Sequence, residues 1–196
     1  MKKYLLSTLA VVGLMACATT VSAAEPIQGP YVVGEAGYSI GTSSNDDAAI
    51  LGLGTGYHIN EFLRTDMTVS YRGWGKVNFR EEGAKKADVW SIPVLFNMYA
   101  SYPIHHMFDV YAMGGIGISW NKTDSIENAK GRTKTNFAWQ VGAGVDYDIN
   151  ECWSLDLGYC FSDLGQARVK GNESFTGRGK QDMRSHDIKL SARYYF

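Results

Sequence analysis

Apolar and polar residues alternate along most of this chain with a period of two. Between residues 63 and 72, the odd positions hold Leu, Thr, Met, Val and Tyr, and the even positions hold Arg, Asp, Thr, Ser and Arg. Residues 186–196 repeat the pattern with apolar residues at even positions. Because successive side chains of a strand point to opposite faces, the pattern predicts long strands with one apolar and one polar face.

Eight such segments follow one another, each about a dozen residues long, with boundaries good to a few residues. Strands of soluble sheets usually have about five or six residues. A tilted strand of the predicted length crosses an apolar layer of about 25 Å. We therefore predict an all-β fold, an eight-stranded antiparallel up-and-down transmembrane β-barrel. Its strands are predicted near residues 30–40, 48–58, 62–73, 88–100, 108–120, 136–149, 153–163 and 184–196.

The connections between these segments alternate in length. The shorter ones are residues 59–61, 101–107 and 150–152. The others are mostly longer and rich in Gly, Asn, Ser, Lys and Glu, near 41–47, 74–87, 121–135 and 164–183. Short turns at one end and long polar loops at the other are typical of outer-membrane barrels. The pattern predicts both termini in the periplasm and four loops outside.

Aromatic residues on the predicted apolar faces gather near both strand ends, as two lipid–water interfaces would favour. In a soluble protein, the alternative, they would be spread more evenly through a core. Near the short turns they are Tyr57, Phe108, Tyr147, Trp153, Tyr194 and Phe196. Near the long loops they are Tyr38, Tyr71, Trp90, Trp120, Phe137 and Phe161.

The first 23 residues have the anatomy of a cleavable secretory signal peptide: two lysines, an apolar run over residues 5–16, and small residues at Val21-Ser22-Ala23. We predict two segments, the signal peptide at 1–23 and the barrel at 24–196. The alternative is a lipoprotein site that would place a lipid on Cys17, although Met15 fits such a site poorly.

Composition and charge narrow the function classes. Removal of residues 1–23 would leave 17 basic and 20 acidic residues, a formal charge of −3. A mildly acidic chain gives no support for nucleic-acid binding. Cys160 lies on the predicted strand 153–163 and Cys152 directly precedes that strand. At the rise of an extended chain they are roughly 26 Å apart, too far for a disulfide bond.

The predicted inward face combines glycine with charge. Eight strands leave an interior just wide enough for side chains, and alternate glycines such as Gly52, Gly54 and Gly56 would make room for larger neighbours. Buried charges need partners or water, so we interpret the inward charges as a network that fixes the barrel. The sharper alternative is a gated ion path. The ten residues are Glu35, Arg64, Asp66, Arg72, Asp109, Asp146, Asp148, Asp156, Lys189 and Arg193.

No motif for catalysis, cofactor binding or metal binding stands out. Ser185-His186-Asp187 spells a triad in consecutive positions, but neighbours on a strand face opposite sides and triads assemble from distant positions. No glycine-rich phosphate loop opens a helix. We expect no enzyme, no cofactor and no metal site.

Three stretches resemble the opacity-type, outer-membrane protein A-like eight-stranded barrels, a family of surface antigens. They are YAMGGIGISWNK (111–122), FAWQVGAGVDYDINECWSLDLGYCFSDLG (137–165) and SHDIKLSARYYF (185–196). The resemblance implies insertion into the bacterial outer membrane by an assembly machinery that reads the last strand. That signal would fall on Ile188, Leu190, Tyr194 and Phe196.

The leading hypothesis is a structural and adhesin-like surface protein whose long loops meet the outside. Loops 121–135 and 164–183 are net basic, which suits lipopolysaccharide or a host-surface glycan as partner. A narrow low-conductance pore is the alternative, and a lipid-modifying enzyme is the third hypothesis.

Overall fold

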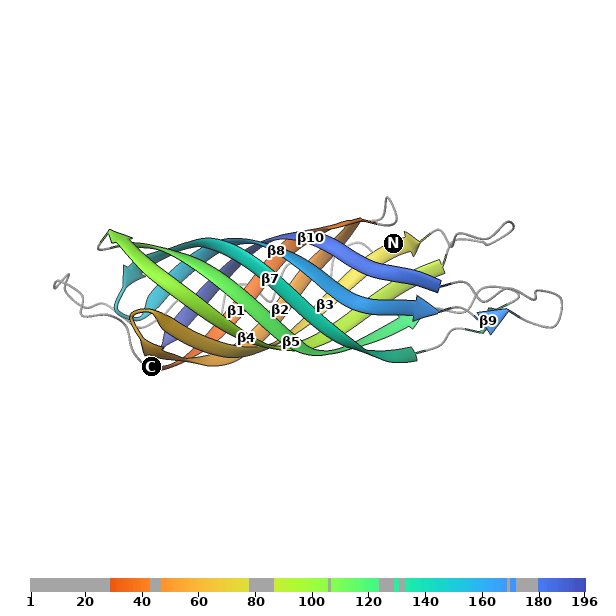
Figure 1. Ribbon diagram of the computed structural model, residues 1–196, viewed down its shortest axis with the longest axis horizontal. Helices are drawn as coiled ribbons and strands as arrows, with labels where there is room; N and C mark the ends of the chain where they lie inside the picture. The colour runs from red at the N-terminus through yellow and green to blue at the C-terminus, as the bar shows by residue number, and fades with distance from the viewer. Residues whose placement is uncertain are drawn as a thin grey trace, which may run out of the picture.

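The described part of the computed structural model comprises residues 29–42, 47–77, 87–105, 107–123, 129–130, 133–168, 170–171 and 180–196. Its strands close into an antiparallel barrel of eight (Figure 1). The predicted fold class is therefore confirmed. The expectations about the signal peptide and Cys17 lie outside the described residues.

All eight predicted strands are present, and most extend further than expected. They are β1 (Gly29–Gly41), β2 (Asp47–Asn60), β3 (Leu63–Val77), β4 (Ala87–His105), β5 (Phe108–Thr123), β7 (Thr133–Asn150), β8 (Trp153–Arg168) and β10 (Lys180–Tyr195). We call the end with the β2–β3, β4–β5 and β7–β8 turns the turn end, and the opposite end the loop end. The C-terminus lies at the turn end, on the left of Figure 1.

Two details differ from the sequence-based expectation. The connection predicted at 101–107 is mostly strand, because Tyr102 and Pro103 of β4 pair with Val110 and Asp109 of β5. The loop end also carries a small separate sheet, in which β6 (Ala129–Lys130) pairs with β9 (Lys170–Gly171). Two-residue strands are too short to produce an alternating pattern, so periodicity cannot predict them.

The register fixes the geometry of the barrel. A path that starts at Leu63 and steps from each residue to its paired partner on the next strand circles the barrel once. It returns to β3 at Gly73 and not at Leu63, so the two ends of the path are displaced from position 63 to position 73. A stagger of this kind requires strands that tilt relative to the barrel axis, as Figure 1 shows. The path runs through Ala100, Ala112, Ala143, Tyr159, Ile188, Tyr38 and Ala49. All strand edges of this sheet are thereby paired, which a lipid environment demands.

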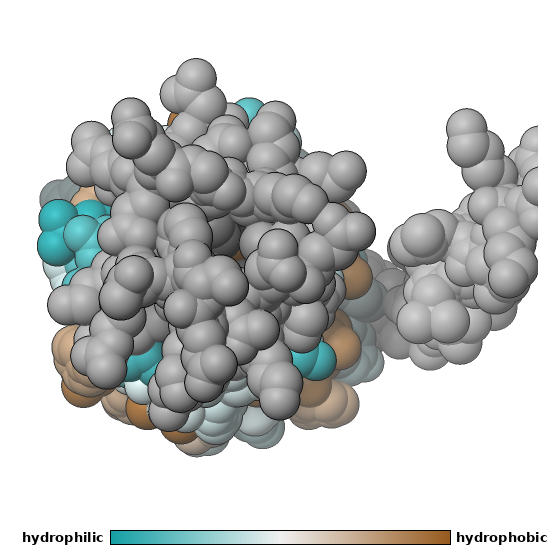
Figure 2. Space-filling view, turned by 90° about the vertical axis from the view of Figure 1, so that its right-hand side faces the viewer, coloured by the Kyte–Doolittle hydropathy of each residue, from teal (hydrophilic) through white to brown (hydrophobic). Residues whose placement is uncertain are grey.

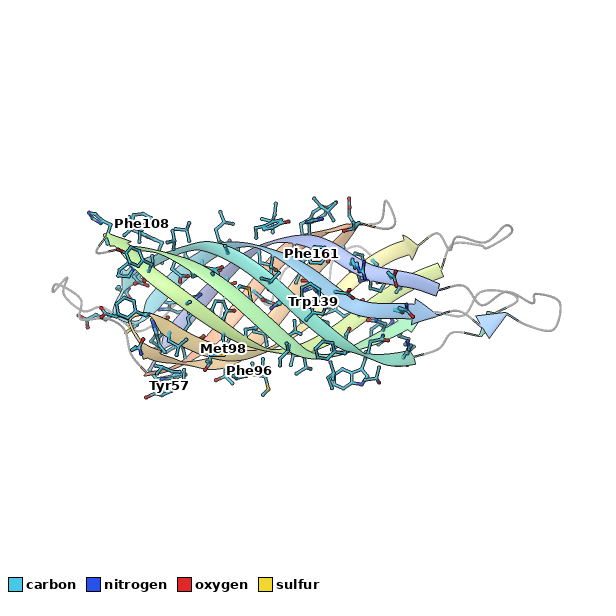
Figure 3. All side chains as sticks on the ribbon, in the orientation of Figure 1. Tyr57, Phe96, Met98, Phe108, Trp139 and Phe161 are labelled. Carbon is cyan, nitrogen blue, oxygen red and sulfur yellow. The ribbon has the colours of Figure 1, made fainter. Side chains whose placement is uncertain are left out.

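The outer wall is apolar and the interior is polar. Leu51 and Leu53 expose 67% and 73% of their surface, which soluble monomers rarely allow over a contiguous area. Seen from the loop end, hydrophobic residues lie along the lower left, the lower edge and the right of the barrel (Figure 2). The labelled aromatic residues Tyr57, Phe96 and Phe108 lie at the outer edges of the barrel in Figure 3. Among the described residues, no helix is long and apolar enough to cross a bilayer.

Glycines let one large ring occupy the narrow interior. A Cβ on Gly144 would lie 2.5 Å from the Tyr111 hydroxyl, and a Cβ on Gly158 would meet the same atom. Tyr111 is buried, so its ring occupies the space that these two positions leave open. Large side chains that lie beside small residues in this way fill the interior, as expected for eight strands.

Candidate functional site

The turn-end half of the interior holds a four-residue ion network. Asp146 of β7 accepts hydrogen bonds from Arg64 of β3 and, at 2.6 Å, from Nη2 of Arg193 on β10. Nη1 of Arg193 also donates to Asp156 of β8 at 2.8 Å. Two arginines and two aspartates balance in charge, and all four side chains are buried. Such a network is tolerable away from water only because each charge has a partner.

Aromatic rings hold Arg64 in place within this network. Its guanidinium carbon lies 4.1 Å from the centre of the Tyr99 ring and 4.8 Å from that of Tyr111. Both distances are within the range of cation–π attraction. The Tyr111 hydroxyl donates to Asp156 at 3.0 Å. The two rings therefore connect Asp146, through Arg64, with Asp156, through the Tyr111 hydroxyl, in one packed unit.

A second tier of polar contacts lies in the middle of the barrel. Asp66 accepts from the Tyr31 hydroxyl at 3.1 Å and from the Asn97 amide at 2.7 Å. Lys189 pairs with Glu35 at 3.3 Å. A cavity lined by Glu35, Tyr111, Asp156 and Lys189, among others, has room for about one water molecule. The middle of the barrel is thus nearly filled.

The third tier is built around Asp187. Its carboxylate accepts from Arg72 at 2.6 Å, from Ser39 at 2.5 Å, from Ser162 at 2.7 Å and from Ser185 at 2.8 Å. Sequence reasoning did not place Asp187 in the network. The signal was available, since Asp187 shares its strand face with Lys189, which had been assigned inward.

An apolar cluster lies inside the barrel at the loop end. Its members come from β2, β3, β4, β7, β8 and β10 and are all buried. These residues occupy inward positions in the loop-end halves of their strands. The cluster therefore covers the polar tiers from that side. It consists of Ala48, Trp74, Val89, Leu95, Ala138, Leu164 and Met183.

The ten inward charges predicted from the sequence fall into three groups. Seven take part in the buried ion pairs just described: Glu35, Arg64, Arg72, Asp146, Asp156, Lys189 and Arg193. Asp66 is buried among neutral donors. Asp109 and Asp148 are half-buried near the turn end, and neither is a partner of Arg64 or Arg193 in these pairs.

Ser185, His186 and Asp187 do not assemble as a triad. Ser185 and Asp187 face the interior and bond each other, whereas the His186 ring lies outside, with Nδ1 2.5 Å from the Tyr159 hydroxyl. Cys152 and Cys160 are not joined to each other by a disulfide bond, as their spacing predicts. Within the described ranges, no group of His, Cys, Asp or Glu is arranged to hold a metal ion.

The last strand carries the predicted assembly signal on its outer face. Ile188 and Leu190 are exposed on the wall of β10. Tyr194 packs against the edge of Phe196, with ring centroids 5.3 Å apart, and against Trp153 at 5.1 Å. These side chains form an apolar stripe that runs to the turn end.

The sequence matches a known family over nearly its whole length. The family model described as "Outer membrane protein beta-barrel domain" matches residues 8–196. A protein of Brucella abortus is 29% identical over 166 residues, which cover 68% of this chain and 56% of that protein. The chain thus spans little more than half of that relative. A Rickettsia prowazekii protein named "Putative adhesin" is 26% identical, with 99% of both chains covered.

Solved structures share the fold at low sequence identity. Neisserial surface protein A superposes with a TM-score of 0.65 and 19% identity, covering 86% of this chain and 97% of that one. Ail, the attachment invasion locus protein of Yersinia pestis, gives a TM-score of 0.55 and 16% identity, covering 88% and 100%. At these identities the likeness concerns the fold alone.

Proposed function

The chain belongs to the family of outer-membrane protein β-barrel domains, and on that basis we propose that it is a non-enzymatic surface protein that contacts other molecules through its loop end. The barrel is located in the bacterial outer membrane, as in the family. Its loop end would face outside and its turn end the periplasm. Rickettsial relatives with adhesin in their names support a role in attachment.

The filled interior is the observation that carries this proposal. Three tiers of paired charges and an apolar cluster occupy the space in which a channel would run. The barrel then serves as a rigid support, and binding would belong to the segments beyond it. Residues 121–135 and 164–183 are net basic. An anionic partner, such as lipopolysaccharide or an acidic glycan of a host surface, fits this charge.

A loop-exchange experiment tests the proposal. Residues 124–132 and 169–179 join strands that are complete without them, so short Gly-Ser links can replace both. Cells that display this variant should lose attachment to a host-cell layer relative to the wild type. The matched control replaces residues 78–86, which connect β3 and β4 at the same end. Unchanged attachment, at equal surface levels of folded protein, would contradict the proposal.

The narrow pore is the second candidate, and the charges along the interior are the observation that favours it. Conduction would require Arg193 to leave both Asp146 and Asp156. It would also require the apolar cluster at the loop end to separate. A pore of this kind would open rarely and pass little current.

We further propose that the outer face of the last strand is the signal for membrane assembly. Ile188, Leu190, Tyr194 and Phe196 present an uninterrupted apolar stripe on β10. Because β10 also closes the barrel against β1, recognition of this strand would select chains that are able to close.

A further inference from the structure

A polar and aromatic cluster lies on the outer wall near the loop end of β8 and β10. Arg184 of β10 stands opposite Asp163 of β8, and His186 stands opposite Phe161. Outward positions further along both strands are apolar, such as Leu157 and Ile188. A charged pair on a lipid-facing wall is tolerated near the interface but costs free energy deeper in the bilayer. Its position therefore marks the level of lipid headgroups.

A carboxylate orients the arginine in this cluster. Nε of Arg184 donates to Oδ2 of Asp163 at 2.9 Å. The Arg184 side chain is 52% exposed, whereas that of Asp163 is 16% exposed. The contact uses one of five guanidinium N–H groups. The remaining donors belong to a planar fork that matches phosphate oxygens in geometry.

Aromatic rings form a continuous surface beside the arginine. The His186 ring stacks on Tyr159 at 5.9 Å and meets the edge of Phe161 at 5.3 Å. Phe161 in turn packs against Trp139 of β7 at 5.7 Å. Figure 3 shows Phe161 and Trp139 on the loop-end half of the wall. Rigid rings of this kind suit contact with alkyl chains at a membrane interface.

Along the strands, Arg184 and the apolar wall follow each other in the same order as the headgroup and the acyl chain of a lipid. Arg184 is four positions nearer the loop end than Ile188, about 13 Å along the strand. A lipid aligned with the wall would place its headgroup at Arg184, while its acyl chain would lie along Phe161 and Ile188. Among anionic lipids, those of the outer leaflet reach this level when the loop end faces outside.

We propose that this surface binds lipopolysaccharide through a phosphate of its acylated sugar headgroup. Arg184 holds the phosphate, Asp163 orients the guanidinium, and the rings of Trp139, Phe161 and His186 hold an acyl chain. The assignment rests on the orientation given under Proposed function, but it does not require the loops to bind any partner.

Native mass spectrometry of the folded barrel in detergent tests this site, with purified bisphosphorylated lipid A as the probe. Arg184→Gln should weaken lipid A binding at least tenfold. Tyr71→Phe is the matched control, since Tyr71 also exposes a polar group near the loop end but belongs to β3, which is not adjacent to β8 or β10 in the wall. It should bind within twofold of the wild type. A gel of heated and unheated samples verifies that each variant is folded.

Two further probes use the wild-type barrel and need no variant. Dephosphorylated lipid A should bind at least tenfold more weakly, and phosphatidylglycerol should not replace lipid A at equal concentration. Equal binding by Arg184→Gln, an equal loss in Tyr71→Phe, or equal binding of the dephosphorylated lipid would overturn the site. Displacement by phosphatidylglycerol would overturn lipopolysaccharide as its ligand. None of these readouts depends on cell attachment, so this site and the proposed function can fail separately.

Discussion

The Arg72 guanidinium donates to the Asp187 carboxylate at 2.6 Å, and neither side chain is exposed. Arg72 comes from β3 and Asp187 from β10, two strands that are not neighbours in the wall. The pair therefore spans the interior and ties opposite parts of the barrel together. Three serine hydroxyls also donate to the same carboxylate, so the aspartate is adapted to remain charged.

Loss of the arginine should destabilise the barrel strongly. Arg72→Met leaves the Asp187 charge buried with hydroxyl donors only, and breaking a buried pair in this way costs about 3–5 kcal/mol. Urea unfolding of the refolded barrel measures the change. Arg184→Met, which breaks the exposed pair with Asp163, is the control and should cost less than about 1 kcal/mol. Equal losses in the two variants would show that burial of the Arg72 pair is unimportant.

A methyl group at Gly158 should be poorly accommodated. A Cβ there meets the Tyr111 hydroxyl, which Asp156 holds in place. Gly158→Ala is expected to cost about 1–3 kcal/mol through overpacking. Gly114→Ala offers a matched control, because a Cβ at that position has no atom within 4 Å, and it should change stability by no more than about 0.5 kcal/mol. A neutral Gly158→Ala would mean that the Tyr111 ring can move.

The apolar cluster should limit any ion flow through the barrel. Trp74→Ser combined with Leu164→Ser replaces two large buried members of that cluster and should raise the frequency of openings in planar bilayers. Tyr71→Ser alters an exposed aromatic residue three positions from Trp74, on the outer face of the same strand, and should leave the recordings unchanged. Silent recordings from the double variant, with folding shown by gel, would place the barrier elsewhere.

The terminal aromatic residue should matter for assembly more than for stability. Phe196→Ser removes the ring that packs on Tyr194 and should reduce the amount of folded barrel in the outer membrane several-fold. Its unfolding free energy after refolding in detergent should change by less than about 1 kcal/mol, because Phe196 is mostly exposed. Phe137→Ser, at another exposed ring, serves as the control for general loss of hydrophobicity. A similar reduction in both variants would contradict a specific signal.

The strands could be predicted because one side of each meets apolar surroundings and the other meets a packed polar interior. Alternation then extends over the full strand, as at residues 63–72. The same rule placed the β4–β5 connection at 101–107, whereas β4 extends to His105. In the structure, Pro103 remains paired with Asp109.

The partners of the inward charges could not be predicted, because they depend on register and on distance across the interior. Arg64 and Asp146 lie on β3 and β7, with two strands between them in the wall. Parity placed both residues inside but left several carboxylates available to each arginine. Asp187 is different, because its parity alone groups it with Lys189 on the inward face of the last strand.

The seam between β1 and β10 also governs how the barrel can fold. Tyr31 pairs with Tyr195, so the first and last strands must find each other across nearly the whole described chain. Closing so long a segment has a large entropic cost and slows folding relative to hairpin formation. Until the final strand docks, two open edges remain available for misassociation. The closed barrel therefore forms late in folding. A chain that is cut short before β10 cannot close, and it would not gain even part of the stability that closure provides.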